Sequence, residues 1–236
     1  MQKLKIDPEL FDLFPDAQLG VLVLDGLDNH VKEERISHYQ ALLDEATQAA
    51  GQFITVDPFR DNPVVASWRK AYQAFKTKKG ARSSIEAMLK RVSQGRQFSP
   101  INPIVDLYNC ISLTYGVPVG GEDLAKVAGD LRLGVATGGE DFRPLGADED
   151  EPALPGEVIY YDQTGANVRC WNWREAQRTM LVEETQRTAL VVEAAYADQQ
   201  AQVQKAVYAM QELFEQELQV KGRVAILTRN NPEVQV

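Results

Sequence analysis

Short segments typical of β-strands fill residues 116–196, whereas helical periodicity occupies the chain before and after them. The strand-like segments are LRLGVA, VIYYD, VRCWNW and TALVVEA, and turn residues separate them. Apolar residues recur at helical spacing in 31–50, 64–76, 84–94, 104–115 and 197–221. Two further apolar runs, 20–24 and 224–227, predict additional strands. This distribution of elements predicts an α+β fold.

The predicted elements follow one another without a linker, a repeat or a low-complexity tract. A chain of 236 residues can bury one sizeable core. We therefore expect residues 1–236 to form a single domain, with a frayed tail from Asn230 onward.

Features of export or membrane insertion are missing from the sequence. No apolar run approaches the roughly 20 residues that span a bilayer, and the beginning, MQKLKIDPELF, has no apolar signal core. The two cysteines, Cys110 and Cys170, do not suggest a disulfide framework. A cytoplasmic protein with no membrane partner is the expectation.

The usual motifs for cofactors and metals are also missing. The sequence has no Walker loop, no Rossmann glycine fingerprint, no HExxH and no EF-hand loop. Both histidines, His30 and His38, fall in one early segment, so a zinc site with the usual ligand spacing is not expected. We predict no metal and no cofactor.

Positive charge is concentrated in one part of an otherwise acidic chain. The net charge is −9, yet residues 69–96 hold nine basic residues and only one acidic residue, Glu86. Such a stretch can bind a polyanion locally, and a solvated helix face explains it equally well. The candidate RNA-binding residues are Arg69, Lys70, Lys76, Lys78, Lys79 and Arg82.

Three stretches in the middle of the chain form an ordered series of motifs. The first is INPIVDLYNCISLTYGVP, residues 101–118. The second contains Gly139-Glu140 and PGEVI at 155–159, and the third is VEAA at 192–195. The series resembles the B3/B4 module of the bacterial phenylalanyl-tRNA synthetase β chain over roughly residues 84–196. In the first stretch the matching positions are Asn102, Ile104, Val105, Asp106, Asn109, Gly116 and Pro118.

The resemblance implies layered, β-sandwich-like sheets flanked by helices. It places the motif-bearing core at 84–196, with an N-terminal extension at 1–80 and a C-terminal helix and strand at 197–228. The patterns GGED at 120–123 and WNWR at 171–174 resemble the short, free-standing members of the family, so a stand-alone B3/B4 protein is the expectation. No segment resembles the class II ligase motifs, so the chain is not expected to charge tRNA. The implied partner is tRNA or aminoacyl-tRNA, and a small amino-acid-like ligand is a further expectation.

In that family the module hydrolyses tyrosine that has been attached to the wrong tRNA. The resemblance implies that Asn109 is a pocket residue and that Glu193 reads the tyrosine hydroxyl. The family's histidine after Gly-x-Pro-Leu is absent, because Gly120 occupies its position. Glu122 and Asp123 are the candidate groups for orienting water, although loop carboxylates on the surface would look the same. As bases they would need a pKa raised by burial.

Neighbouring residues complete the predicted site. Gly120, Gly121, Trp173 and Arg174 are the further candidates for substrate binding, and glycines in turns are the alternative for the first two. A strand through 169–174 would place the rings of Trp171 and Trp173 on one face, either against the ligand or in the core.

Arginines near these segments also have two interpretations. Arg132, Arg169 and Arg174 could bind a phosphate or a carboxylate. Alternatively, they pair with Glu140, Glu157 or Glu175 within the protein.

Three functions remain open from the sequence. The chain could be a deacylase that clears mischarged aminoacyl-tRNA in trans, or a binder of tRNA or a free amino acid that lacks catalysis. An enzyme of small-metabolite chemistry is the third possibility. Convergence of Asn109, Glu122, Trp173 and Glu193 on one cavity is the structural expectation on which the tRNA-related functions depend.

Overall fold

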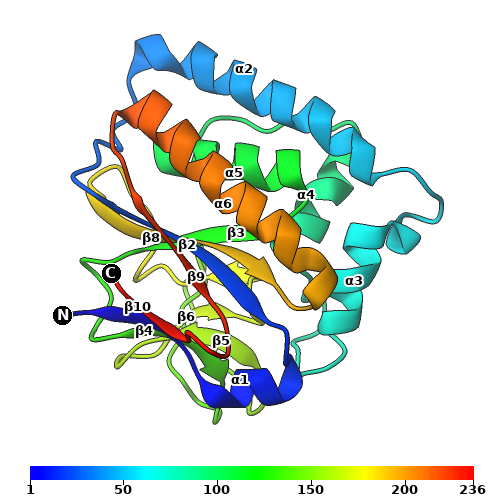
Figure 1. Ribbon diagram of the computed structural model, residues 1–236, viewed down its shortest axis with the longest axis vertical. Helices are drawn as coiled ribbons and strands as arrows, with labels where there is room; N and C mark the ends of the chain where they lie inside the picture. The colour runs from blue at the N-terminus through cyan, green and yellow to red at the C-terminus, as the bar shows by residue number, and fades with distance from the viewer.

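Two β-sheets and six α-helices build the protein, seen here in a computed structural model that describes residues 1–236 (Figure 1). The first sheet runs, in spatial order, β10 (Glu233–Gln235), β1 (Lys3–Ile6), β4 (Leu131–Val135), β5 (Val158–Tyr161), β6 (Ala166–Arg169) and β7 (Arg174–Glu175). The second sheet runs β3 (Val119–Asp123), β8 (Arg187–Ala194), β2 (Gln18–Asp25) and β9 (Arg223–Leu227). The helices are α1 (Pro8–Leu13), α2 (Glu33–Ala50), α3 (Pro63–Ala71), α4 (Ser84–Ser93), α5 (Pro103–Tyr115) and α6 (Ala197–Leu218).

The elements are stacked in layers, as Figure 1 shows. The first sheet lies below the second sheet, and helices α5 and α6 lie above the second sheet. Helix α2 lies against α5 at the top of the view. One cluster of 34 buried residues includes the inner side chains of both sheets, and another cluster of 18 joins the second sheet to the helices. The predicted α+β class with layered sheets flanked by helices is therefore confirmed.

Both faces of the second sheet are buried, which explains the nearly continuous apolar run of β8. Ala189 and Val191 belong to the cluster between the sheets, whereas Leu190 and Val192 belong to the cluster under the helices. This alternation follows from the two-residue period of a strand. By the same alternation Glu193 faces the first sheet, so its carboxylate lies inside the protein.

Local sequence sets the limits of α5, the helix that carries the first motif. The Asn102 side chain caps the first turn by accepting a hydrogen bond from the Val105 backbone N–H. The helix ends at Gly116, whose φ of 65° is left-handed. A Cβ atom at that position would lie 2.8 Å from the ring of Phe53, so glycine is required for both reasons.

Three predictions about local structure are wrong. Residues 119–123 form strand β3 instead of a glycine turn and a surface loop, because β8 supplies their ladder partners. The tail beyond Asn230 is ordered as β10, which pairs with β1. The helix expected over 64–76 ends at Ala71.

The N-terminal residues contribute to both sheets. Strand β1 lies between β10 and β4, and β2 lies between β8 and β9 in the middle of the second sheet. Residues 1–80 are therefore part of the layered structure that holds the motifs.

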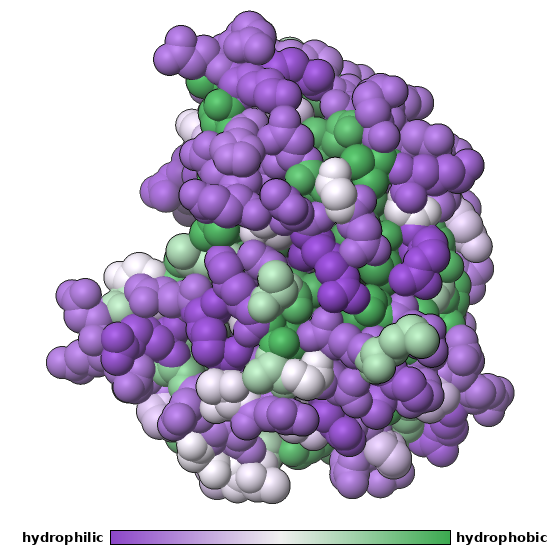
Figure 2. All heavy atoms as spheres, turned by 90° about the vertical axis from the view of Figure 1, so that its left-hand side faces the viewer, coloured by the Kyte–Doolittle hydropathy of each residue, from purple (hydrophilic) through white to green (hydrophobic).

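The surface is largely hydrophilic on the face that Figure 2 shows, which is the left-hand side of Figure 1. Hydrophobic residues appear there only in small areas between hydrophilic ones. None of the helices combines the length and the apolar character that crossing a bilayer requires.

Candidate functional site

A cavity of about 460 Å³ lies between the two sheets, next to the motif-bearing segments. Strands β3 and β8 line it from the second sheet, and β4, β5, β6 and β7 line it from the first. Helices α4 and α5 contribute further lining residues. Two exposed apolar side chains, Ile101 and Leu145, also belong to the lining. Asn109, Glu122, Trp173 and Glu193 all line this cavity, so the predicted convergence is observed.

Glu193 on β8 connects the two sheets at this cavity through a side-chain hydrogen bond. It is 2% exposed, and its Oε1 atom accepts a hydrogen bond of 2.6 Å from the hydroxyl of Tyr160 on β5. Its Oε2 atom accepts a hydrogen bond of 2.5 Å from the side-chain amide of Asn172. Burial raises the pKa of Glu193 to about 7, and these two hydrogen bonds act in the opposite direction. The carboxyl group is thus held in one orientation and titrates near neutral pH.

The orientation of Asn172 is itself fixed by a further set of bonds. Its Oδ1 atom accepts a hydrogen bond of 3.2 Å from the Ser84 backbone N–H. The Tyr72 hydroxyl lies 3.0 Å from the same atom and shares its single hydrogen with the Cys170 carbonyl, 2.7 Å away. The amide NH₂ group must then be the part that donates to Glu193. This relay connects α4 and the chain after α3 to the floor of the cavity.

A second pair of carboxyl groups occupies another part of the cavity. Glu122 is 4% exposed, and burial raises its pKa well above the usual range, with a further increase from the charge of Glu175. Thr179 and Arg178 lower it to a smaller extent. Burial raises the pKa of Glu175 to about 7. The sequence interpretation that Glu122 is a surface carboxylate is therefore wrong.

Asp123 is the predicted catalytic residue that does not line the cavity. It follows Glu122 on β3 and so projects from the opposite face of the sheet. Its Oδ2 atom accepts a hydrogen bond of 2.9 Å from Thr185, and its Oδ1 atom caps the Ala125 backbone N–H at 3.0 Å. These partners give Asp123 a structural position in the turn after β3.

Gly120 and Gly121 both line the cavity, and the absence of a side chain has a different consequence at each position. A Cβ atom on Gly121 would lie 2.3 Å from Leu190, so only glycine fits at this point of the ladder. A Cβ atom on Gly120 would instead point into open space, 4.0 Å from Oε1 of Glu175. A side chain at position 120 would therefore extend into the cavity toward Glu175.

The chain between β6 and β7 is a tight turn and not the strand that the alternation of Trp171 and Trp173 suggested. Cys170 and Trp171 have φ values of 47° and 63°, which are left-handed and unusual for such residues. Trp171 is fully buried and packs edge-on against Trp68. Trp173 is partly buried, and both tryptophans line the cavity.

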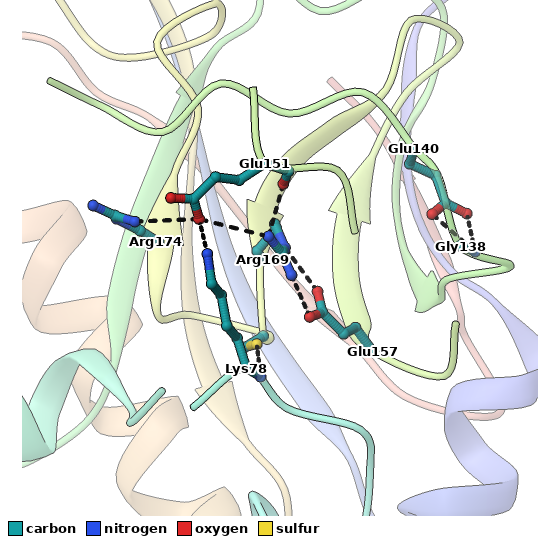
Figure 3. A network of polar contacts seen from close by, with 8 residues as sticks. Lys78, Gly138, Glu140, Glu151, Glu157, Arg169 and Arg174 are labelled. Carbon is teal, nitrogen blue, oxygen red and sulfur yellow. Dashed lines mark hydrogen bonds and ion pairs between the residues drawn. The ribbon is translucent and has the colours of Figure 1, made fainter. Parts of the chain in front are cut away.

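Arg169 and Arg174, which lie at the two ends of this turn, belong to an ion-pair network (Figure 3). Arg169 donates two hydrogen bonds, of 2.8 and 2.5 Å, to the carboxylate of Glu157, and both side chains are almost completely buried. Lys78 and Arg174 converge on Glu151, with Arg174 at 3.6 Å. Of the two interpretations of Arg169, the structure shows the pairing with a glutamate, and Glu157 is the partner. Arg132 differs, because it pairs with Asp7.

The predicted RNA-binding residues are spread over several environments. Arg69 pairs with Glu86 at 2.6 Å, and the Lys70 ammonium lies 4.6 Å from the centre of the Tyr196 ring. Lys76, Lys79 and Arg82 are exposed, whereas Lys78 is bound to Glu151. A hollow in the surface brings together Arg60, Arg69, Arg82 and Lys90, and Asp57 and Glu86 also line it.

Sequence reasoning missed three residues with a clear place in the cavity. Tyr160 and Asn172 hold Glu193, and Glu175 stands near Glu122. The signal was weak because each lies in a short, irregular segment whose partners are distant in sequence. No group of three histidine, cysteine, aspartate or glutamate side chains could hold a metal ion.

Comparison with known proteins relates the chain to one family and to one solved structure. The model of a family described as the B3/4 domain matches residues 67–224, more than half of the chain. Among solved structures, an N-terminal fragment of the phenylalanyl-tRNA synthetase beta-subunit from Pyrococcus horikoshii is similar, with a TM-score of 0.50 and 14% sequence identity. The alignment covers 93% of this chain and 50% of that fragment, so the chain spans half of the fragment's length. No curated protein matches the chain.

Proposed function

The chain belongs to the B3/4 domain family, and we propose that it binds tRNA and hydrolyses the ester of a mischarged aminoacyl-tRNA in trans. The observation that carries this proposal is the cavity between the sheets. Asn109 from α5 and Glu193 from β8, 84 positions apart in the sequence, line the same space of about 460 Å³. That volume lies within the range of small-ligand sites and accommodates an aminoacyl group.

Recognition of the acyl group is assigned to Glu193. Tyr160 and Asn172 fix the carboxyl group while leaving each oxygen with capacity for another hydrogen bond. A ligand hydroxyl that reaches it gains a strong bond, whereas a ligand without the hydroxyl leaves a buried polar group less well satisfied. The site should therefore distinguish tyrosine from phenylalanine.

Hydrolysis of an aminoacyl ester requires a water molecule to attack the carbonyl carbon. Its oxygen bonds to that carbon, the bond to the ribose oxygen breaks, and a proton passes to the ribose. The ester is already activated, so positioning and polarisation can supply the necessary rate. We assign polarisation of the carbonyl to Asn109 and orientation of the water to Glu175, which lies beside Glu122. A pKa of about 7 suits Glu175 to accepting a proton near neutral pH.

Helix α4 lies between the cavity and the surface hollow that Arg60, Arg69, Arg82 and Lys90 line, which we call the basic surface. Its residues Ala87, Met88 and Arg91 line the cavity, while Glu86 and Lys90 line the neighbouring hollow with its arginines. A tRNA end that enters the cavity would therefore pass beside a surface of positive charge. We propose that phosphates of the tRNA bind this surface, which would explain a local basic stretch on an acidic protein.

The test of the proposed function is a deacylation assay. The protein is incubated with a panel of labelled aminoacyl-tRNAs that includes tyrosine charged onto the phenylalanine acceptor. We expect release above the buffer control from at least one member of the panel. Asn109→Ala should reduce that release about 100-fold, the effect of removing one polarising donor.

The competing function is a binder of tRNA or of a free amino acid that performs no hydrolysis. The observation that favours it is Gly120, which leaves the cavity without the imidazole of the family. No release from any aminoacyl-tRNA, together with retained tRNA binding, would rule out the hydrolase and support the binder.

Binding of tRNA should depend strongly on salt if the basic surface carries it. We expect Arg60→Glu and Arg82→Glu, both in the hollow, each to weaken binding and to lower the slope of log K against log salt by about 1. The matched control is Lys205→Glu, which reverses the charge of an exposed lysine on α6. Binding that is insensitive to salt, or equally weakened by all three variants, would count against this docking surface.

A further inference from the structure

One part of the cavity contains a buried acceptor that nothing in the protein satisfies. The Oε1 atom of Glu122 is buried and makes no hydrogen bond, and the residue lines the cavity. Withdrawing a carboxyl oxygen from water without a partner is costly, and the Thr179 side chain bonds to the carboxyl group without satisfying this oxygen. A ligand group that reaches this oxygen would remove that cost.

A second carboxyl group faces the same space. Gly120 and Glu122 alternate on β3 and share the face toward the cavity, and Oε1 of Glu175 lies 4.0 Å from the Cβ position of Gly120. The charge of Glu175 adds to the effect of burial on the pKa of Glu122. The two groups therefore form one acidic subsite.

The arginines around this subsite are engaged elsewhere. Arg178 donates to both oxygens of Asp162, at 2.8 and 2.9 Å. Arg174 is 3.6 Å from Glu151, and the guanidinium of Arg91 lies over the Phe98 ring. None of these three arginines is therefore paired with Glu122 or Glu175.

We propose that Glu122, with Glu175 beside it, binds a primary ammonium group of the ligand. The proposal deepens the function proposed above and rests on it, because an aminoacyl ester carries an α-ammonium group. A metal ion fits less well, since the cavity lacks a third suitably placed ligand and hard cations take six or more oxygens. On binding, the ammonium lowers the pKa of Glu122 and displaces the proton that this carboxyl group holds, which leaves to solvent.

The spacing of the two ends of the cavity agrees with such a ligand. Glu122 is opposite Ala189 in the β3–β8 ladder, and Glu193 lies four residues further along β8. Four residues of strand extend about 13 Å. The two carboxyl groups therefore belong to separate points along the β3–β8 ladder, and a ligand that contacts both needs a polar group at each end. A para-hydroxyphenyl group joined to an ethylammonium has this form.

Tyramine and tyrosol provide a matched pair of probes, because they differ only in an ammonium against a hydroxyl group. Calorimetric titration of the intact protein should show tyramine binding at least about tenfold more tightly than tyrosol. Glu122→Gln should reduce this preference to less than about twofold and leave the affinity for tyrosol unchanged. Unchanged tyrosol affinity also shows that the variant keeps its cavity. Glu175→Gln should give a smaller loss.

Equal affinity of the wild-type protein for the two probes would overturn the ammonium subsite. So would failure of tyramine to bind at millimolar concentration, or a preference that survives Glu122→Gln. The outcome is separate from the deacylation assay. Preference for tyramine without release of an amino acid from any tRNA would support the ammonium subsite and rule out the hydrolase function. Release of an amino acid without preference for tyramine would support the hydrolase function and rule out the ammonium subsite.

Discussion

Replacing Glu193 with alanine is expected to remove the preference of this protein for a hydroxylated aromatic ligand. We expect the wild type to bind tyramine about 10- to 100-fold more tightly than phenethylamine, which lacks only the hydroxyl. The reason is that Glu193 is 2% exposed and held by Tyr160 and Asn172, so a ligand hydroxyl meets a fixed, dehydrated acceptor. In Glu193→Ala the two affinities should become equal.

Two further variants make this result interpretable. Glu184→Ala removes an exposed glutamate outside the cavity and should leave the selectivity unchanged. Glu193→Gln keeps the shape of the side chain and one hydrogen-bonding oxygen. It can therefore be measured in place of the alanine variant if that variant does not fold. If the uncharged pair tyrosol and 2-phenylethanol is used instead, the selectivity can be tested independently of the ammonium subsite. Unchanged selectivity in Glu193→Ala would show that the role assigned to Glu193 is incorrect.

Replacing Arg169 with methionine is expected to lower the free energy of unfolding by about 3–5 kcal/mol. Arg169 is 2% exposed at its side chain and Glu157 is fully buried, so the substitution leaves a buried carboxylate without its partner. The bond from Arg169 to the backbone carbonyl of Glu151, 2.7 Å long, is lost at the same time. Urea denaturation at neutral pH would measure the change.

The matched control is the double variant in which Arg169 and Glu157 are both methionine. Because it removes both charges from the interior, its stability should return close to that of the wild type. A cost below about 1 kcal/mol for the single variant would contradict the buried ion pair that Figure 3 shows. Arg169 ends β6 immediately before the turn at Trp171, so we also expect the single variant to bind tyramine more weakly.

Local signals in the sequence were sufficient for most of the helices and for the principal strands. The helix of the first motif begins at its Asn102 cap and ends at Gly116, because capping and left-handed glycine are properties of neighbouring residues. Strands β2 and β8 were visible as apolar runs since both of their faces are buried. The ordered motifs also predicted the family and that Asn109 and Glu193 would meet.

Strand β3 shows what local signals could not supply. Its sequence, VGGED, has the composition of a turn, and only pairing with β8 makes it a strand. That pairing places Glu122 inside the cavity and Asp123 on the other face, so two adjacent acids that looked equivalent have different positions.

The sequence by itself determined the α+β class, the limits of helix α5 and the residues that carry the family motifs, because these depend on period, capping and identity along a short stretch of chain. Tertiary structure alone decided the acidic subsite of Glu122 and Glu175, the relay from Tyr72 through Asn172 to Glu193, and the turn at Trp171. Each of these depends on groups brought together from different strands and helices. Burial, which raises the pKa values of these carboxyl groups and leaves Oε1 of Glu122 without a hydrogen-bond partner, exists only when the layers have packed.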